Sequence, residues 1–252
     1  ELRIEVDGVP LSAEWRTSLH SVRVHQQLSL PTLCELIFRA PPDTISLRLD
    51  SDLRLEIKDQ SIPLFVGQIT ALQQRYLPNS QRELRVRAYD PIHVLRKRQS
   101  VCTHIQVTPQ ELAQQFVLPL GLIVDSAESP PLYPYLIQHH QTDFDFLCEH
   151  LERCGLYFTV REGTLHLLTL AGLAETIPLQ LGRTLLEAEV ESNRERTAQA
   201  ITAQGWNPAL MESFGATVRQ PRSGRQLPIS MRENSSAEFW LVDQALIDPL
   251  HI

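Results

Sequence analysis

Apolar and polar residues alternate with a period of two through the first ninety positions of the chain. Leu2, Ile4 and Val6 lead into Asp7-Gly8, a pair that accepts the positive φ angles of a tight hairpin turn. Further alternating runs lie at residues 22–24, 36–38, 47–49, 53–57, 65–71 and 84–88. Short strands separated by Pro, Asn, Asp and Ser predict an antiparallel barrel or sandwich.

The period changes at Asp90-Pro91. Asp90 suits the N-cap of a helix and Pro91 its first position, and the helical turn that follows ends in the basic run 96–98. A second capped helix begins at Thr108, and a short strand is expected at 122–124. The three prolines of segment 129–135 predict a loop or an edge strand.

A third helix is predicted over residues 143–154. Thr142 can cap it together with Asp145, and Gly155 can end it in the left-handed conformation. Its core-facing stripe is Phe144, Leu147, Cys148, Leu151 and Cys154. Residues 156–160 and 164–170, joined at 161–163, then predict a β-hairpin, so that helix and hairpin form one α/β unit.

Strands are expected again beyond residue 171. The alternating segments are 187–193, 197–204, 216–218 and 239–242. Gly205-Trp206-Asn207-Pro208 predicts a turn, and the polar segment 219–232 predicts an exposed loop.

The net charge of −7 does not favour a nucleic-acid partner, because such proteins are more often basic. No apolar run approaches the roughly 20 residues of a membrane-spanning helix, and the first residues do not resemble a signal peptide. We therefore expect the chain to be cytoplasmic when made. Because it begins with Glu1 and not Met, its original start is expected to be removed or to lie upstream.

The sequence predicts no catalytic, cofactor-binding or metal-binding residue. Cys34, Cys102, Cys148 and Cys154 are expected to be buried free thiols. The densest set of candidate ligands is His139, His140, Asp143, Asp145, Glu149 and His150. Adjacent histidines in an extended segment point to opposite sides, and Asp145 and His150 lie about 140° apart on a helix, so convergence on a metal is not expected. The acids are interpreted as helix-capping groups, while a Cys–His pair that meets only in the fold stays open.

Phe146 lies about 160° from Phe144 on the helix, off the core stripe. A large aromatic residue in that position is typical of a contact surface, so Phe146 is predicted to pack against another module or a neighbouring subunit. The basic run 96–98 is interpreted as a solvated helix end, with a partner surface as the alternative.

Four stretches carry a family resemblance. They are Asp143-Phe-Asp-Phe-Leu147, followed by an acidic helix and Gly155-Leu-Tyr-Phe158; LFVGQI at 64–69; LRVRAYDPIHVLRKRQ at 84–99; and AITAQGWNP at 200–208, with Asn207 where Asp is usual. In type and in their order along the chain they resemble the hub proteins of contractile injection machines: the phage late control protein D, the VgrG spike protein of type VI secretion, and their extracellular injection-system relatives. The resemblance covers nearly the whole chain.

The resemblance implies an α+β, mainly β fold, in which two tube-like antiparallel β-barrels flank a small α/β module. The expected domains are 1–92, 93–170 and 171–252. Since family members continue past the positions of Val242 to Gln244 into further elements, the second barrel is expected to be incomplete.

The implied role is a non-enzymatic baseplate hub, a homotrimer that joins the six-fold inner tube to the three-fold spike. Its implied partners are the inner tube protein, the spike domain or spike tip and other baseplate proteins, within a phage tail or an injection particle. A β-rich, cell-wall-degrading hydrolase that uses acids from 139–152 is the main alternative, and a monomeric adhesion or carbohydrate-binding module is a third. A hydrolase would gather two of those carboxylates in an enclosed pocket.

Overall fold

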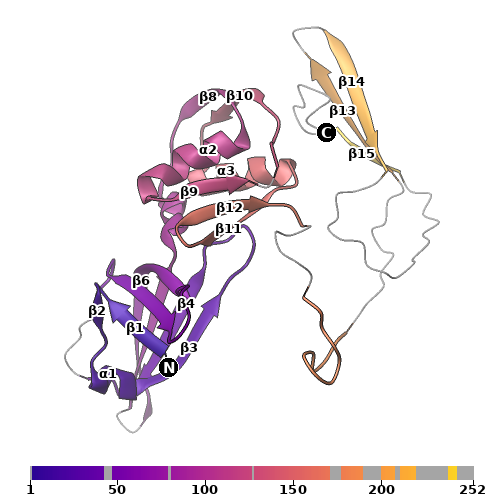
Figure 1. Cartoon of the computed structure of the whole chain (residues 1–252). Coiled ribbons are helices and arrows are strands. Elements are labelled where there is room, and N and C mark those ends of the chain that lie inside the picture. Colours follow the sequence, from indigo (N-terminus) through magenta and orange to yellow (C-terminus); the bar gives the residue numbers. More distant parts are fainter. Residues whose placement is uncertain are drawn as a thin grey trace. The chain divides into compact units, whose positions relative to one another are not determined.

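The computed structural model describes residues 2–42, 47–78, 81–126, 128–170, 177–189, 200–207, 211–219 and 238–242. The chain divides into two compact units, one of Glu1–Glu152 with Tyr157–Leu167 and one of Arg153–Leu156 with Leu168–Ile252. Strands predominate in the described residues, as predicted (Figure 1). None of the helices in these ranges is both long and apolar enough to cross a membrane.

A curled seven-stranded sheet forms the N-terminal part of the first unit (Figure 1). Its strands are β1 (Leu2–Val6), β2 (Val9–Pro10), β3 (Leu19–His25), β4 (Leu33–Arg39), β5 (Asp52–Ile57), β6 (Phe65–Tyr76) and β7 (Arg82–Tyr89). They pair antiparallel in the order β2-β1-β5-β6-β7-β4-β3. The Asp7-Gly8 hairpin is confirmed, with φ angles of 50° and 75°.

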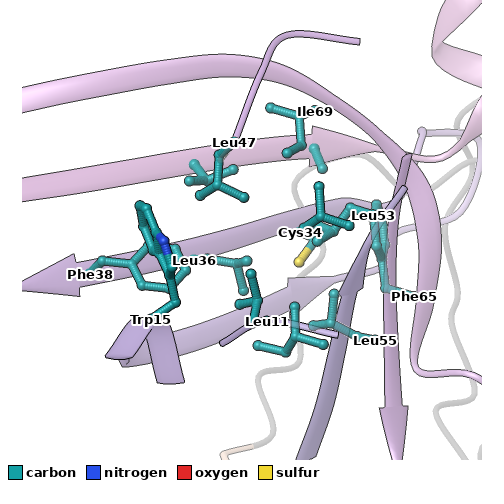
Figure 2. Packing of buried hydrophobic residues seen from close by; sticks show 14 of the residues in the cluster. Leu11, Trp15, Cys34, Leu36, Phe38, Leu47, Leu53, Leu55, Phe65 and Ile69 are labelled. Carbon is teal, nitrogen blue, oxygen red and sulfur yellow. The ribbon is translucent and has the colours of Figure 1, made fainter. Parts of the chain in front are cut away.

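The inward side chains of these strands form the core shown in Figure 2. Trp15, from the short helix α1 (Ala13–Ser18), meets the Phe38 ring edge-on at 5.1 Å between centroids. The prediction of a strand at 47–49 was wrong. Leu47 is buried in this core, but the chain turns at once and Asp50 has a φ of 64°, which a strand residue does not adopt.

Four helices and five strands follow the sheet in the described residues. The elements are η2 (Pro91–Lys97), β8 (Cys102–Val107), α2 (Pro109–Val117), η3 (Leu118–Leu120), β9 (Ile123–Ser126), β10 (Tyr133–Gln138), α3 (Asp143–Arg153), β11 (Tyr157–Arg161) and β12 (Thr164–Leu168), η2 and η3 being 3-10 helices. β8 and β10 form a two-stranded antiparallel ribbon, and a second sheet has the order β11-β12-β9. β8 was not predicted, because polar residues interrupt its short sequence, CTHIQV.

The predicted helix caps, hairpin turn and edge strand in this part of the chain are confirmed. Thr108 and Glu111 make the reciprocal capping box of α2, and the Thr142 hydroxyl accepts the Asp145 N–H at the start of α3. The hairpin turns at Gly163, whose φ is 75°. Segment 129–135 ends in β10, which pairs with β8 as an edge strand, in agreement with the prediction.

The second unit contains a three-stranded sheet with the order β14-β13-β15. Its strands are β13 (Ala200–Asn207), β14 (Glu212–Val218) and β15 (Glu238–Leu241). The predicted turn at 205–208 was wrong for its first residues, because Gly205 pairs with Phe214 inside the sheet. Residues 187–189 form no strand, and 190–193, Pro208 and 220–232 lie outside the described residues. The domain boundaries at 92/93 and 170/171 stay predictions.

Candidate functional site

The acids of segment 139–152 face different surroundings. Asp143 is buried, and its Oδ1 accepts a hydrogen bond from Gln138 Nε2 at 2.8 Å while its Oδ2 lies 3.4 Å from Arg98 Nε. Asp145 is exposed and accepts the Thr142 hydroxyl at 2.7 Å. Asp143 thus joins the end of η2 to the start of α3, and Asp145 caps the helix, so the two carboxylates do not form an acid/base pair.

The two adjacent histidines do not point to opposite sides, which corrects the prediction. His140 Nδ1 lies 2.7 Å from His139 Nε2, and both side chains are exposed. They meet because this segment bends instead of staying extended. Within the described ranges, no group of three or more metal-binding side chains is found.

Phe146 is buried inside the α/β part, and the prediction of a surface contact was wrong. Its ring stacks on His104 of β8 at 5.7 Å, and the rings of Phe116 and His150 lie 6.5 and 4.4 Å away. On the other side of α3, Phe144 meets the Phe158 ring at 6.0 Å. α3 has two buried sides because elements pack on both of them.

The basic run 96–98 is only partly solvated. Arg96 lies over the Phe144 ring at 4.6 Å from the centroid, a cation–π contact, and Arg98 approaches Asp143. Lys97 is exposed, as the interpretation of a solvated helix end requires.

A Cys–His pair does form in the fold. Cys102 Sγ lies 3.3 Å from His104 Nε2, two residues along β8, and 3.9 Å from Gln138 Oε1. Cys102 is exposed, contrary to the prediction, whereas Cys34 is buried and Cys148 half-buried. Burial raises the pKa of each of these two thiols to about 12, so they stay protonated and inert at neutral pH. A spacing of two on a strand was the signal for the Cys102–His104 pair, but β8 was not predicted.

A cleft of about 610 Å³ lies between the β5–β6 connection and the turn of the β11–β12 hairpin. Its lining includes Arg54, Leu64, Asp90, Leu122 and Arg161. No residue from 139–152 lines it, nor does the Cys102–His104 pair. The hydrolase alternative, which places acids of that segment in an enclosed pocket, is therefore not favoured.

Asp90 ties the β3–β4 loop to η2. Its Oδ2 accepts the Thr32 N–H at 2.8 Å, and its own N–H donates to the Thr32 carbonyl at 3.1 Å. The predicted side-chain cap on η2 does not form, because the carboxylate makes its hydrogen bond to Thr32 instead. Burial raises the Asp90 pKa from its ordinary 3.8 to about 6, against the lowering effect of the Thr32 hydrogen bonds.

Replacing Asp90 with Asn is expected to remove a pH dependence of stability. Since the folded chain holds the Asp90 proton more tightly than the unfolded chain, wild-type stability falls as the pH rises through the interval from 3.8 to about 6. At 1.36 kcal/mol per pKa unit, wild type should lose about 3 kcal/mol relative to Asp90→Asn between about pH 3 and about pH 7. Urea unfolding of both proteins across this range measures it. Parallel stability curves would contradict the assignment to Asp90.

Residues 54–237 match the family described as the Alg8 N-terminal domain, which is more than half of the chain. The chain belongs to the Alg8 N-terminal domain family. The match to this family begins in β5 and ends just before β15. No curated protein matches the sequence.

Three solved structures show which proteins share the fold of this member of the Alg8 N-terminal domain family. The 43 kDa tail protein of prophage MuSo2 from Shewanella oneidensis has a TM-score of 0.67 at 14% identity, over 100% of this chain and 74% of that one. A tail protein from Neisseria meningitidis MC58 has a TM-score of 0.63 at 14% identity, over 98% and 72%.

The third structure is that of the Escherichia coli c3393 protein, a component of the type VI secretion system. It has a TM-score of 0.50 at 14% identity, over 65% of this chain and 48% of that one, and is described as similar in structure to T4 bacteriophage tail proteins gp27 and gp5. The chain therefore has a tail-protein fold, which agrees at the level of the fold with the resemblance drawn from the sequence.

Proposed function

We propose that this chain is a non-enzymatic structural subunit of a contractile tail or injection particle. More specifically, we propose that it is a homotrimeric baseplate hub that joins the six-fold inner tube to the three-fold spike. The observation that carries the proposal is the tail-protein fold, which follows the MuSo2 tail protein along the full length of this chain. Fold alone does not set function, so the proposal needs its own test.

In this proposal residues 1–92 and 171–252 form tube-like barrels on either side of an α/β module at 93–170, the second barrel being incomplete. Two barrels from each of three subunits would supply six similar positions for the tube. Other surfaces would bind the spike and further baseplate proteins. No nucleic acid or cofactor has a part in this role.

The β8–β10 ribbon supports a role in assembly. Its outer side carries Ile105, Tyr135 and Ile137, which are 73%, 47% and 57% exposed, and Ile105 is paired with Tyr135 across the strands. Contiguous exposed apolar side chains are typical of protein contact surfaces.

Light scattering of the full chain tests the trimer. We expect a mass three times the 28.7 kDa of one chain, because a closed three-fold ring saturates its contacts at three subunits. Electron microscopy of particles from cells that lack this chain should in addition show tubes without spikes. A chain that stays monomeric at every concentration, with normal particles in its absence, would contradict the proposal.

A further inference from the structure

The solvent side of strands β3, β4, β7 and β6 carries an unusual set of charges, which we call the arginine face. Its charged members are Arg23, Glu35, Arg39, Arg75, Glu83, Arg85 and Arg87. The face contains neither Lys nor Asp, and its charge is +3 on a chain whose net charge is −7. The rest of the chain therefore carries −10.

The strand register sets these charges in rows. Arg23 and Arg87 stand on either side of Glu35, and Arg39 and Arg75 stand on either side of Glu83. Since residues directly opposite each other in an antiparallel sheet share a side, all of them project from the same surface. Their neighbours in sequence, among them Leu36, Val86 and Ala88, point into the core and are fully buried.

A charge ladder that only stabilised the sheet would pair each arginine with the glutamate opposite it. Instead, both glutamates make long ion pairs with Arg85. Arg85 Nε lies 3.7 Å from Glu35 Oε1, and Arg85 Nη2 lies 3.8 Å from Glu83 Oε1. Arg23, Arg39, Arg75 and Arg87 have no carboxylate of a described residue within ion-pair distance. Four guanidinium groups are thus available on a surface held rigid by a packed core.

This composition is typical of a protein interface. Arginine is enriched at interfaces and lysine depleted, because the planar guanidinium group binds carboxylates through two parallel hydrogen bonds. Ile37, half-buried between Ser21 and Arg85 on the same side, adds an apolar centre. A nucleic acid fits less well, since Glu35 and Glu83 would face its phosphates.

We propose that the arginine face binds an acidic surface on the next copy of this chain in the trimer. The inference rests on the proposed trimer, because a closed three-fold ring joins two different patches of each subunit. The basic face of one copy would contact an acidic surface of the next copy, because the part of each chain outside the face has a net charge of −10. The contact gives the ring its direction as well as part of its affinity.

The test compares two double variants of the full chain. Arg23→Glu with Arg87→Glu reverses two arginines of the face, whereas Arg16→Glu with Arg161→Glu changes the net charge equally at two exposed arginines that do not belong to it. We expect the face variant to need at least about 30-fold more protein to form trimers in light scattering, and the control to match wild type. Circular dichroism checks folding, and Arg23→Gln with Arg87→Gln replaces a face variant that does not fold.

The remaining outcomes separate the two proposals. A face variant that forms trimers at the same protein concentration as wild type would overturn the arginine-face contact and leave the trimer intact. A monomeric wild type would overturn the trimer itself. Binding of a DNA duplex by wild type that the face variant loses, with no change in mass, would identify the face as a nucleic-acid surface and overturn the inference.

Discussion

Replacing Gly67 with Ala is expected to lower the free energy of unfolding by about 3 kcal/mol, the upper range for overpacking a core. A Cβ atom at Gly67 would lie 2.1 Å from the Tyr89 carbonyl oxygen and 2.6 Å from Phe65 Cζ. The first of these is backbone, so β6 and β7 would have to move apart. That movement would strain the sheet next to the Asp90 link.

Urea denaturation followed by circular dichroism measures this loss. Gly215→Ala is the matched control, since a Cβ there would lie 3.3 Å from the Ala203 carbonyl oxygen, a distance that a small shift relieves. Its expected effect is within about 0.5 kcal/mol. Equal losses of unfolding free energy in the two variants would show that the close approach of the Tyr89 carbonyl to Gly67 is not the cause.

Replacing Phe146 with Ala is expected to cost about 3–5 kcal/mol, the usual range for emptying a buried aromatic site. Phe146 is 1% exposed, and its ring fills the space between His104, Phe116 and His150. The loss should appear in urea denaturation as an earlier transition of the first unit.

Tyr76→Ala is the control for Phe146→Ala, because it removes an aromatic ring that is 71% exposed at the end of β6. It should change stability by less than about 0.5 kcal/mol, as surface substitutions usually do. A Phe146→Ala chain of wild-type stability but reduced oligomer mass would restore the interpretation of Phe146 as a subunit contact.

The Phe-x-Gly-x-Ile motif illustrates the limit of local patterns. Alternation placed Phe65 and Ile69 in the core correctly, and both are buried. The same pattern contains no reason for a glycine between them. That reason is the Tyr89 carbonyl on the neighbouring strand, which the curl of the sheet brings against Gly67.

Phe146 was misplaced for a related reason. A helix wheel assigns one buried side to α3, and Phe144 lies on it. The packing of β8 and α2 against the opposite side buries Phe146 as well, and that packing depends on residues thirty or more positions earlier in the chain. Asp90 shows the same effect, since Thr32 takes the carboxylate that the sequence had assigned to a helix cap.

By itself the sequence determined the period-two strands of the sheet, the caps of α2 and α3, the hairpin turns and the resemblance to tail hubs. Each depends on residues a few positions apart, whose spacing and backbone preferences act locally. Tertiary structure alone decided the burial of Asp90 and Phe146 and the rows of the arginine face. Strand register and packing bring distant segments together, and the free energy of those contacts outweighs local preference.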